Sequence, residues 1–242
     1  MKQGKLITTA NVVKADRAIA YLKRRPKMEL VGLGLVYGKP GLGKSTWASR
    51  TAFSKGYIYL RLESTTTPKN FAQRLLSSLA SRYNYGNVPT YGAANTVFKR
   101  CMAILENHED AVIIVDEIDY AFSNKQLLGA IRDIVDETLA IVILVGMQNA
   151  KEKLLQVDEY YFDRCNVFCE FSSSNQNDIL ELCLQVMNKT PNKTMQEMIY
   201  QESTGNLRRA VKLIYGIENI SGSNYGNADQ TIECIRGENE NK

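Results

Sequence analysis

The sequence predicts an α/β fold in which a five-stranded parallel sheet is flanked by helices and followed by a small C-terminal helical lid. Short apolar runs alternate with amphipathic stretches of helical spacing over residues 31–171, as in parallel sheets that are covered by helices. Several runs are nearly continuous Val, Ile and Leu, which is typical of strands buried on both faces. After residue 171 only helical spacing continues, which predicts the lid.

The predicted elements follow one another in a simple order. The five predicted strands are Val31–Tyr37, Tyr57–Leu62, Ala111–Val115, Ala140–Val145 and Val167–Phe171. Helices are predicted between them where apolar residues recur at helical intervals, over Phe71–Leu79, Val97–Leu105 and Leu127–Val135. After a polar break, the three lid helices are predicted over Ile179–Met187, Thr194–Glu202 and Leu207–Ile217.

These elements predict four parts of the chain. They are a basic N-terminal helical segment (1–30), the α/β core (31–171), the lid (172–220) and a tail (221–242). The tail is rich in Gly, Asn and Glu, so we expect it to fray, although Ile232–Ile235 are apolar enough to pack.

Composition excludes several classes of protein. Of the 242 residues, 44% are apolar and 23% are charged, which excludes disordered and collagen-like chains. The longest apolar run, Leu30–Gly38, is far shorter than the ~20 residues that cross a bilayer, and residues 1–27 lack a signal-peptide core. Five cysteines without framework spacing indicate reduced thiols. We therefore expect a cytoplasmic protein without membrane contact, in which Cys165 and Cys169 pack within a strand.

Basic residues are concentrated near the N-terminus. Residues 1–56 contain 12 Lys and Arg against 2 Asp and Glu, a balance of +10, so the remaining residues carry −6 of the net +4. Such a segment is suited to contact phosphates, and Lys23, Arg24 and Arg25 are candidates for DNA contact. A solvated helix face is the alternative interpretation.

A glycine-rich motif follows the first predicted strand. Gly38-Lys39-Pro40-Gly41-Leu42-Gly43-Lys44-Ser45-Thr46 matches G-x-x-x-x-G-K-[ST] between a predicted strand and a predicted helix, which is the context of a P-loop. Its backbone amides and the helix N-terminus are suited to bind the β- and γ-phosphates. We expect Lys44 to bridge phosphate oxygens and the Ser45 hydroxyl to bind Mg²⁺. The motif therefore predicts a site for ATP and Mg²⁺ in which all nine residues contact the nucleotide or its metal.

The third predicted strand ends in two carboxylates that fit a Walker B motif. Asp116 is placed to hold Mg²⁺, mostly through water, and Glu117 is placed to act as the general base on the attacking water. An acidic pair at the surface is the alternative. The interval of 72 residues between Lys44 and Asp116 leaves room for one strand and two helices, which predicts an additional strand between the two motif strands.

Two further segments are suited to sense the nucleotide. Gln148 or Asn149 follows the fourth predicted strand and is placed to sense the γ-phosphate, although an ordinary loop amide fits equally well. Arg208 belongs to the turn Gly205-Asn206-Leu207-Arg208 that opens the last lid helix. We expect its guanidinium to face the phosphates, with a solvated arginine as the alternative.

Arg164, just before the fifth predicted strand, is a candidate arginine finger for the site of a neighbouring subunit. A local ion pair with Asp163 or Glu159 is the alternative, and Arg132 competes for the finger role.

Together these motifs resemble the AAA+ ATPases over residues 31–217. Within them, three segments look like the phage Mu B transposition protein group, namely Gly32–Ser45, Ile131–Thr138 and Ile143–Met147. The resemblance implies an ATPase encoded by a phage or mobile element in a bacterial host. It also implies assembly on duplex DNA in the ATP state, as a ring or helical filament, and delivery of target DNA to a transposase that stimulates hydrolysis. The chain departs from the Mu protein in having only 37 residues before the P-loop, too few for a helix-turn-helix domain.

A protein that selects targets promiscuously has to bind phosphate rather than bases. Arg61 and Lys69, around the end of the second predicted strand, are candidate contacts beside the hydroxyls of Thr65 and Thr66. Thr67 before Pro68 instead fits a helix N-cap with proline at the first helical position.

Two other functions fit the same motifs. One is a nucleotide switch that acts on a protein partner, such as a secretion or signalling ATPase. The other is a helicase loader or replication initiator. The basic N-terminal segment favours the functions that involve DNA.

Overall fold

The computed structural model describes residues 1–2, 4 and 7–220, which divide into two compact units. One unit consists of residues 14–40 and 44–171, and the other of residues 1–13 and 41–43 and the chain from Ser172 onward. Ile232–Ile235 lie outside the described residues. Within the described part of the chain, the helices are too short or too polar to span a membrane.

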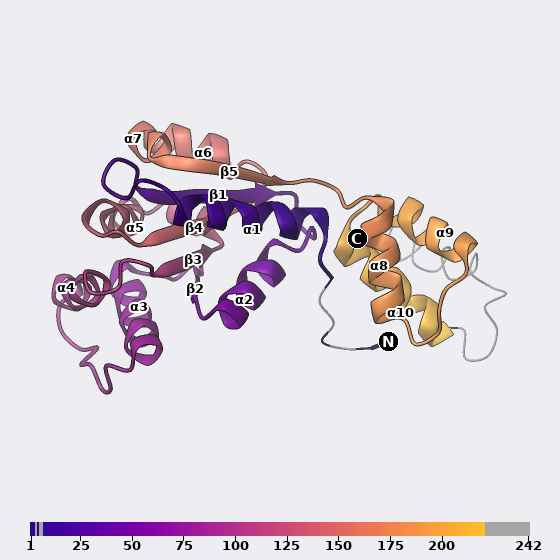
Figure 1. Ribbon diagram of the computed structural model, residues 1–242, viewed down its shortest axis with the longest axis horizontal. Helices are drawn as coiled ribbons and strands as arrows, with labels where there is room; N and C mark the ends of the chain where they lie inside the picture. Colours follow the sequence, from indigo (N-terminus) through magenta and orange to yellow (C-terminus); the bar gives the residue numbers. More distant parts are fainter. Residues whose placement is uncertain (3, 5–6, 221–242) are drawn as a thin grey trace. The chain divides into compact units, whose positions relative to one another are not determined.

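A five-stranded parallel sheet forms the centre of the first unit, as predicted (Figure 1). Its strands are β1 (Gly32–Gly38), β2 (Ile58–Arg61), β3 (Val112–Asp116), β4 (Ile141–Val145) and β5 (Cys165–Phe171). They lie in the order β2-β3-β4-β1-β5, so β4 separates β1 from β3 and the predicted additional strand is confirmed. Both β3 and β4 are buried along their whole length, which explains their continuous aliphatic sequences.

The register of the sheet brings the C-terminal ends of its strands to one edge. Arg61 of β2 pairs with Asp116 of β3, and Val145 of β4 pairs with both Asp116 and Val36 of β1. The segments that follow these four strands therefore meet at the edge where parallel sheets generally bind their ligands.

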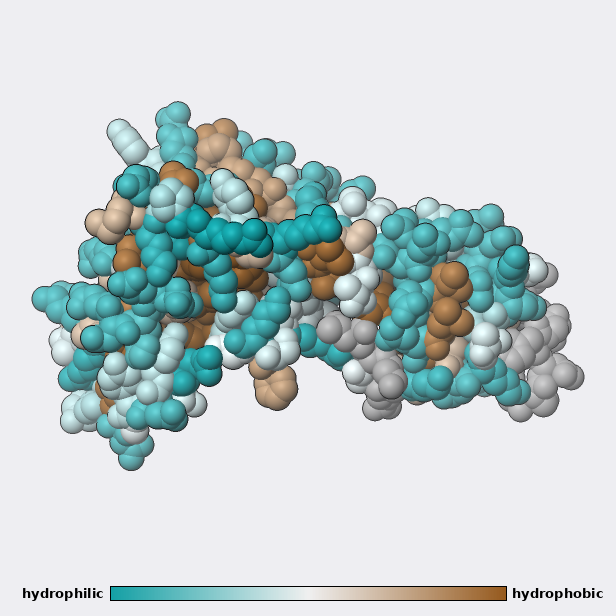
Figure 2. All heavy atoms as spheres, in the orientation of Figure 1, coloured by the Kyte–Doolittle hydropathy of each residue, from teal (hydrophilic) through white to brown (hydrophobic). Residues whose placement is uncertain are grey.

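Helices cover both faces of the sheet. On one face lie α1 (Ala10–Lys23), whose outward side chains are strongly hydrophilic (Figure 2), and α2 (Lys44–Lys55). There Leu22 lies 3.1 Å from the position that a Cβ on Gly34 would take, so α1 packs closely on β1. The helices that share a core with Leu33 and Leu35 on the opposite face are α3 (Pro68–Tyr83), α4 (Ala94–Leu105), α5 (Lys125–Glu137), α6 (Ala150–Val157) and α7 (Glu159–Asp163).

Two local predictions about side chains are confirmed. Thr67 caps α3, since its side chain accepts a hydrogen bond from the amide of Asn70 at 3.2 Å and Pro68 is the first helical residue. Cys165 and Cys169 are buried in β5, as expected for side chains that pack within a strand.

Three helices form the second unit, as the periodicity predicts. They are α8 (Gln176–Val186), α9 (Lys193–Ser203) and α10 (Leu207–Ile220). Asn175 begins α8 with a capping box that involves Asp178, which satisfies two amides at the helix start. Ile179, Ile199 and Ile214 are fully buried in the shared core of these helices.

Candidate nucleotide site

The loop between β1 and α2 is built from glycines in conformations that other residues avoid. Gly38, Gly41 and Gly43 have φ values of 151°, 82° and 89°, a region that favours glycine. A Cβ on Gly38 would lie 2.5 Å from the carbonyl oxygen of Phe171. The Nζ of Lys44 donates to two carbonyl oxygens of the loop at 2.7 and 2.9 Å and is buried. The predicted P-loop thus holds an ammonium group against its own backbone at the start of α2.

Asp116 ends β3 with both carboxylate oxygens engaged. Its Oδ1 accepts a hydrogen bond from the amide of Glu117 at 2.9 Å, and its Oδ2 accepts one from the hydroxyl of Tyr59 on β2 at 2.8 Å. The Asp116 side chain is only 1% exposed, so these two bonds fix its orientation. Burial, and then the bond to Asp116, raise the pKa of Tyr59 well above its usual value. The hydroxyl therefore keeps the proton that it donates.

Glu117 follows in a left-handed backbone conformation, with φ 58° and ψ 44°. This conformation costs on the order of 1 kcal/mol for a residue that has a Cβ, and such strain concentrates at functional sites. Its Oε1 lies 3.3 Å from Nη2 of Arg61. Arg61, which is expected from the sequence to contact DNA, is therefore the ion-pair partner of Glu117.

A third carboxylate, Asp119, joins this loop to the loop after β4. Its Oδ2 accepts a hydrogen bond from the amide of Met147 at 2.7 Å, and its buried Oδ1 lies 3.6 Å from the ammonium of Lys153. Gln148 and Asn149 come next in the chain, and both are exposed. Sequence reasoning missed Asp119, although its spacing of three residues from Asp116 was available as a signal.

The donors at this edge fit a Mg²⁺-nucleotide. Asp116 and Ser45, the second residue of α2, present carboxylate and hydroxyl oxygens, which Mg²⁺ prefers. Glycines let a loop turn its backbone amides toward phosphate oxygens. The residue types present therefore fit the group.

In the second unit, α10 begins against the glycine loop. The amide of Arg208 donates to the carbonyl oxygen of Gly41 at 3.1 Å, and a Cβ on Gly41 would lie 2.4 Å from Oδ1 of Asn206. These residues belong to the same compact unit. The Arg208 guanidinium is exposed and forms no hydrogen bond or ion pair within the described part of the chain.

Both candidate arginine fingers contact the same carboxylate of their own chain, and Arg132 also pairs with Asp133 and Asp158. Nε of Arg164 donates to Oδ1 of Asp136 at 2.6 Å, and Nε of Arg132 lies 3.8 Å from Oδ2 of the same residue. The alternative of a local ion pair therefore applies to Arg164, but its partner is Asp136 rather than Asp163 or Glu159.

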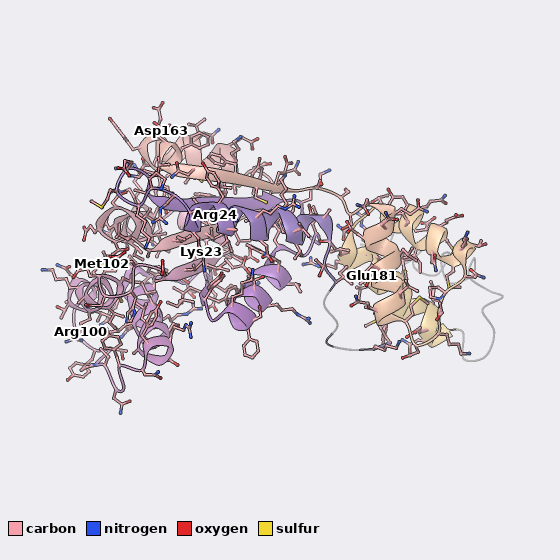
Figure 3. The ribbon with its side chains drawn as sticks, viewed as in Figure 1. Lys23, Arg24, Arg100, Met102, Asp163 and Glu181 are labelled. Carbon is pink, nitrogen blue, oxygen red and sulfur yellow. The ribbon has the colours of Figure 1, made fainter. Side chains whose placement is uncertain are left out.

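The remaining candidates for DNA contact differ in their availability. Arg25 is 7% exposed, and its guanidinium donates to three backbone carbonyl oxygens at 2.7 to 3.0 Å. The expectation that Arg25 contacts DNA is therefore corrected, because its donors are used within the fold. Lys23 lies over the ring of Tyr57, with 4.8 Å between Nζ and the ring centre. Arg24, next to it in Figure 3, and Lys69 are exposed.

A polar hollow lies beside the start of α3. Its volume is about 280 Å³, and it is lined by Glu63, Thr65, Thr66, Asn70, Gln73 and Arg74. Thr65 and Thr66, suggested by the sequence as hydroxyls near DNA, thus belong to the hollow.

Comparison with known proteins identifies one family model, described as an AAA domain, which matches residues 28–155. Among curated proteins, none matches the sequence. A similar solved structure is the Aeropyrum pernix ORC1 protein in complex with DNA, with 19% identity and a TM-score of 0.63 over 96% of this chain and 66% of that chain. The Aeropyrum pernix ORC2 protein with ADPNP and ADP has 13% identity and a TM-score of 0.66 over 96% and 70% of the two chains.

A RuvB mutant from Thermotoga maritima is also similar, with 20% identity and a TM-score of 0.58 over 96% of this chain and 71% of that chain. At these identities the similarity establishes the fold. The match to ORC1 leaves about a third of that chain uncovered.

Proposed function

The chain belongs to the AAA domain family, and from this premise we propose that it is a Mg²⁺-dependent ATPase whose nucleotide state controls its binding to DNA. One observation carries the proposal: the glycine loop, Asp116 and Glu117 follow strands whose C-terminal ends share one edge of the sheet. That arrangement is suited to phosphoryl transfer, in which catalysis consists mainly of positioning and charge stabilisation.

Each residue of the site has a distinct part in the proposed reaction. Lys44 and the loop amides bind the β- and γ-phosphates, and Ser45 and Asp116 hold Mg²⁺. The bound metal supplies positive charge to the transferred phosphoryl group. Glu117 orients the attacking water and accepts its proton. Because Arg61 pairs with Glu117 at 3.3 Å, the carboxylate has to leave Arg61 to reach a water.

Other residues complete the proposed site. Arg208 reads the phosphate charge from the lid, and Gln148 or Asn149 senses the γ-phosphate from the loop after β4. Arg164, or else Arg132, contributes a guanidinium to the site of a neighbouring copy, so the active assembly is a ring or helical filament. Such a site is complete only between subunits.

The DNA-directed role with the better support is that of an initiator or helicase loader. The similar folds include a protein named ORC1 in complex with DNA, and a protein named ORC2 with ADPNP and ADP. Lys69, which is exposed, supplies a phosphate contact that does not depend on base sequence.

Target selection for a transposase is the second candidate. The three segments Gly32–Ser45, Ile131–Thr138 and Ile143–Met147 favour it through their resemblance to the Mu B group. In this case the partner is a transposase that stimulates hydrolysis, and the chain is encoded by a phage or mobile element.

The test measures binding of the chain to a fluorescent random-sequence DNA duplex by fluorescence anisotropy. The measurement is made with ATP, with ADP and without nucleotide. We expect tight binding only with ATP and a steep loss of affinity as salt is raised. The Lys44→Ala variant should lose this binding, whereas Glu117→Gln should retain ATP and stay on the duplex. DNA binding that ignores the nucleotide, or no binding at all, would leave only the nucleotide switch for a protein partner.

Electron microscopy of the same samples separates the two DNA-directed roles. A continuous helical filament along random duplex in the ATP state favours target selection, and closed rings or isolated particles favour an initiator or loader.

A further inference from the structure

A hollow on the first unit, at the C-terminal half of α1, is unrelated to the nucleotide site. Its volume is about 460 Å³, and it is lined by Arg17, Ala20, Tyr21, Arg24, Arg25, Pro26 and Leu30. The lining combines cationic groups with aromatic and aliphatic surface, so the hollow differs in character from a purely phosphate-binding site.

Two arginines at this hollow carry charge that no carboxylate of the described chain neutralises. Arg17 and Arg24 are exposed, and neither side chain forms an ion pair or hydrogen bond within the residues that the structure describes. By contrast, Lys27 and Lys55 in the same basic segment are paired with carboxylates. Arg17 lies on α1 and Arg24 in the turn directly after it, and both line the hollow together with Tyr21.

Apolar side chains are exposed at the same place. Tyr21 is 59% exposed, Leu30 is 37% exposed, and Met28 in the adjoining segment is 85% exposed. Apolar surface that gathers beside polar residues marks interaction sites. Tyr and Arg are also the residues that most often dominate the binding energy of protein interfaces.

Arg25 makes the wall of the hollow rigid. Its guanidinium donates to the carbonyl oxygens of Leu22 at 3.0 Å, Leu30 at 2.8 Å and Leu139 at 2.7 Å. These bonds tie the end of α1 to the segment before β1 and to Leu139, two residues before β4. The surface is therefore formed in advance, which lowers the entropic cost of binding a partner.

The hollow lies at the opposite end of β1 from the P-loop. Leu30 precedes β1 and the loop follows Gly38, so the seven-residue strand separates them by about 20 Å. A partner at the hollow therefore leaves the nucleotide loop accessible.

We propose that this surface binds an acidic peptide segment of a protein partner. Carboxylates of the peptide pair with Arg17 and Arg24, and one apolar side chain enters the hollow beside Tyr21 and Leu30. Duplex DNA matches the charge but offers no apolar group at its phosphate surface to fill the hollow. The proposal goes beyond the ATPase function because it assigns a second surface with a different class of partner.

The probe for the test is a fluorescein-labelled peptide, Glu-Glu-Phe-Glu-Glu-Leu-Glu-Glu, titrated with the whole chain and followed by anisotropy. We expect saturable binding that Arg24→Glu and Tyr21→Ala each weaken by about tenfold or more. Lys99→Glu makes the same charge change at an exposed position of α4 and should leave the peptide affinity unchanged. A peptide with Gln in place of every Glu should bind much more weakly.

Several outcomes would overturn the proposal. These are no binding of the acidic peptide to the unmodified chain, an unchanged affinity in Arg24→Glu or Tyr21→Ala, and an equal loss in Lys99→Glu. Loss of duplex DNA binding in Tyr21→Ala, with ATP binding retained, would assign the surface to nucleic acid instead. Failure of the peptide alone does not affect the proposed ATPase function, because ATP and DNA binding are measured on the same samples.

Discussion

At the scale of single residues, Tyr59 and Arg61 determine how the two carboxylates of the candidate site are held. Side chains alternate along a strand, so these residues, two positions apart, lie on the same face of β2. Tyr59 donates to Asp116, and Arg61 pairs with Glu117. Neither role was predicted from the sequence, because both depend on the register of β2 against β3, which side chains distant in the chain determine. By contrast, the P-loop and Asp116 were recognisable because their chemistry requires a fixed local pattern.

Replacing Tyr59 by Phe should weaken the response of the protein to Mg²⁺. The substitution removes one of the two hydrogen bonds that orient Asp116 and leaves the ring in place. Loss of such a supporting bond typically lowers metal affinity by about 10-fold or more. A Mg²⁺ titration of fluorescent ATP-analogue binding should therefore shift to higher concentration, whereas binding without metal stays unchanged.

The matched control is Tyr83→Phe, which alters a tyrosine of α3 that stacks on His108. An identical Mg²⁺ dependence in Tyr59→Phe and the unmodified chain would mean that the bond to Asp116 has no part in metal binding.

At the scale of elements, the sequence predicted the strands and the long helices well, because burial and periodicity are local properties. The boundaries differed where pairing determines them: β5 begins at Cys165, two residues before the predicted start, where it pairs with Leu33 of β1. The short helices α6 and α7, of 8 and 5 residues, were not predicted. A helix of five residues is too short to show a period, and it is stabilised by packing rather than by propensity.

The packing of these elements predicts the reactivity of the thiols. Burial raises the pKa of Cys101 and Cys165 to about 12, and that of Cys169 and Cys183 to about 11. Because the thiolate is the reactive form, these four thiols remain protonated and slow near neutral pH.

The Cys234→Ser substitution leaves only these four thiols in the chain. Ellman's reagent should react slowly with the native protein. Once denaturant is added, it should react with all four thiols. Absorbance of the released thiolate measures both rates. Rapid reaction of any thiol in the native chain would show that its element opens readily or packs differently.

At the scale of the whole molecule, the contacts of the two candidate finger arginines bear on whether a neighbouring copy completes the site. Arg164 and Arg132 share Asp136 within the chain, Arg132 also pairs with Asp133 and Asp158, and both arginine side chains are 36% exposed. An exposed ion pair contributes little to stability, so the pair can separate at small cost when another anion is offered. The local ion pair is therefore compatible with a role of the arginine in the site of a neighbouring subunit. The sequence pattern could not distinguish a local ion pair from such an arginine finger.

Mixing two inactive variants tests that role. The Arg164→Ala variant lacks the candidate finger but keeps the P-loop lysine. The Lys44→Ala variant lacks the P-loop lysine but keeps Arg164. If one site uses Lys44 of one subunit and Arg164 of the next, an equal random mixture restores about a quarter of the interfaces. ATP hydrolysis measured on DNA should then recover to about that fraction of the unmodified rate, although each variant alone is inactive. Arg132→Ala mixed with Lys44→Ala distinguishes the competing candidate. If neither mixture recovers activity, the arginines act within their own chain, where Asp136 already holds them.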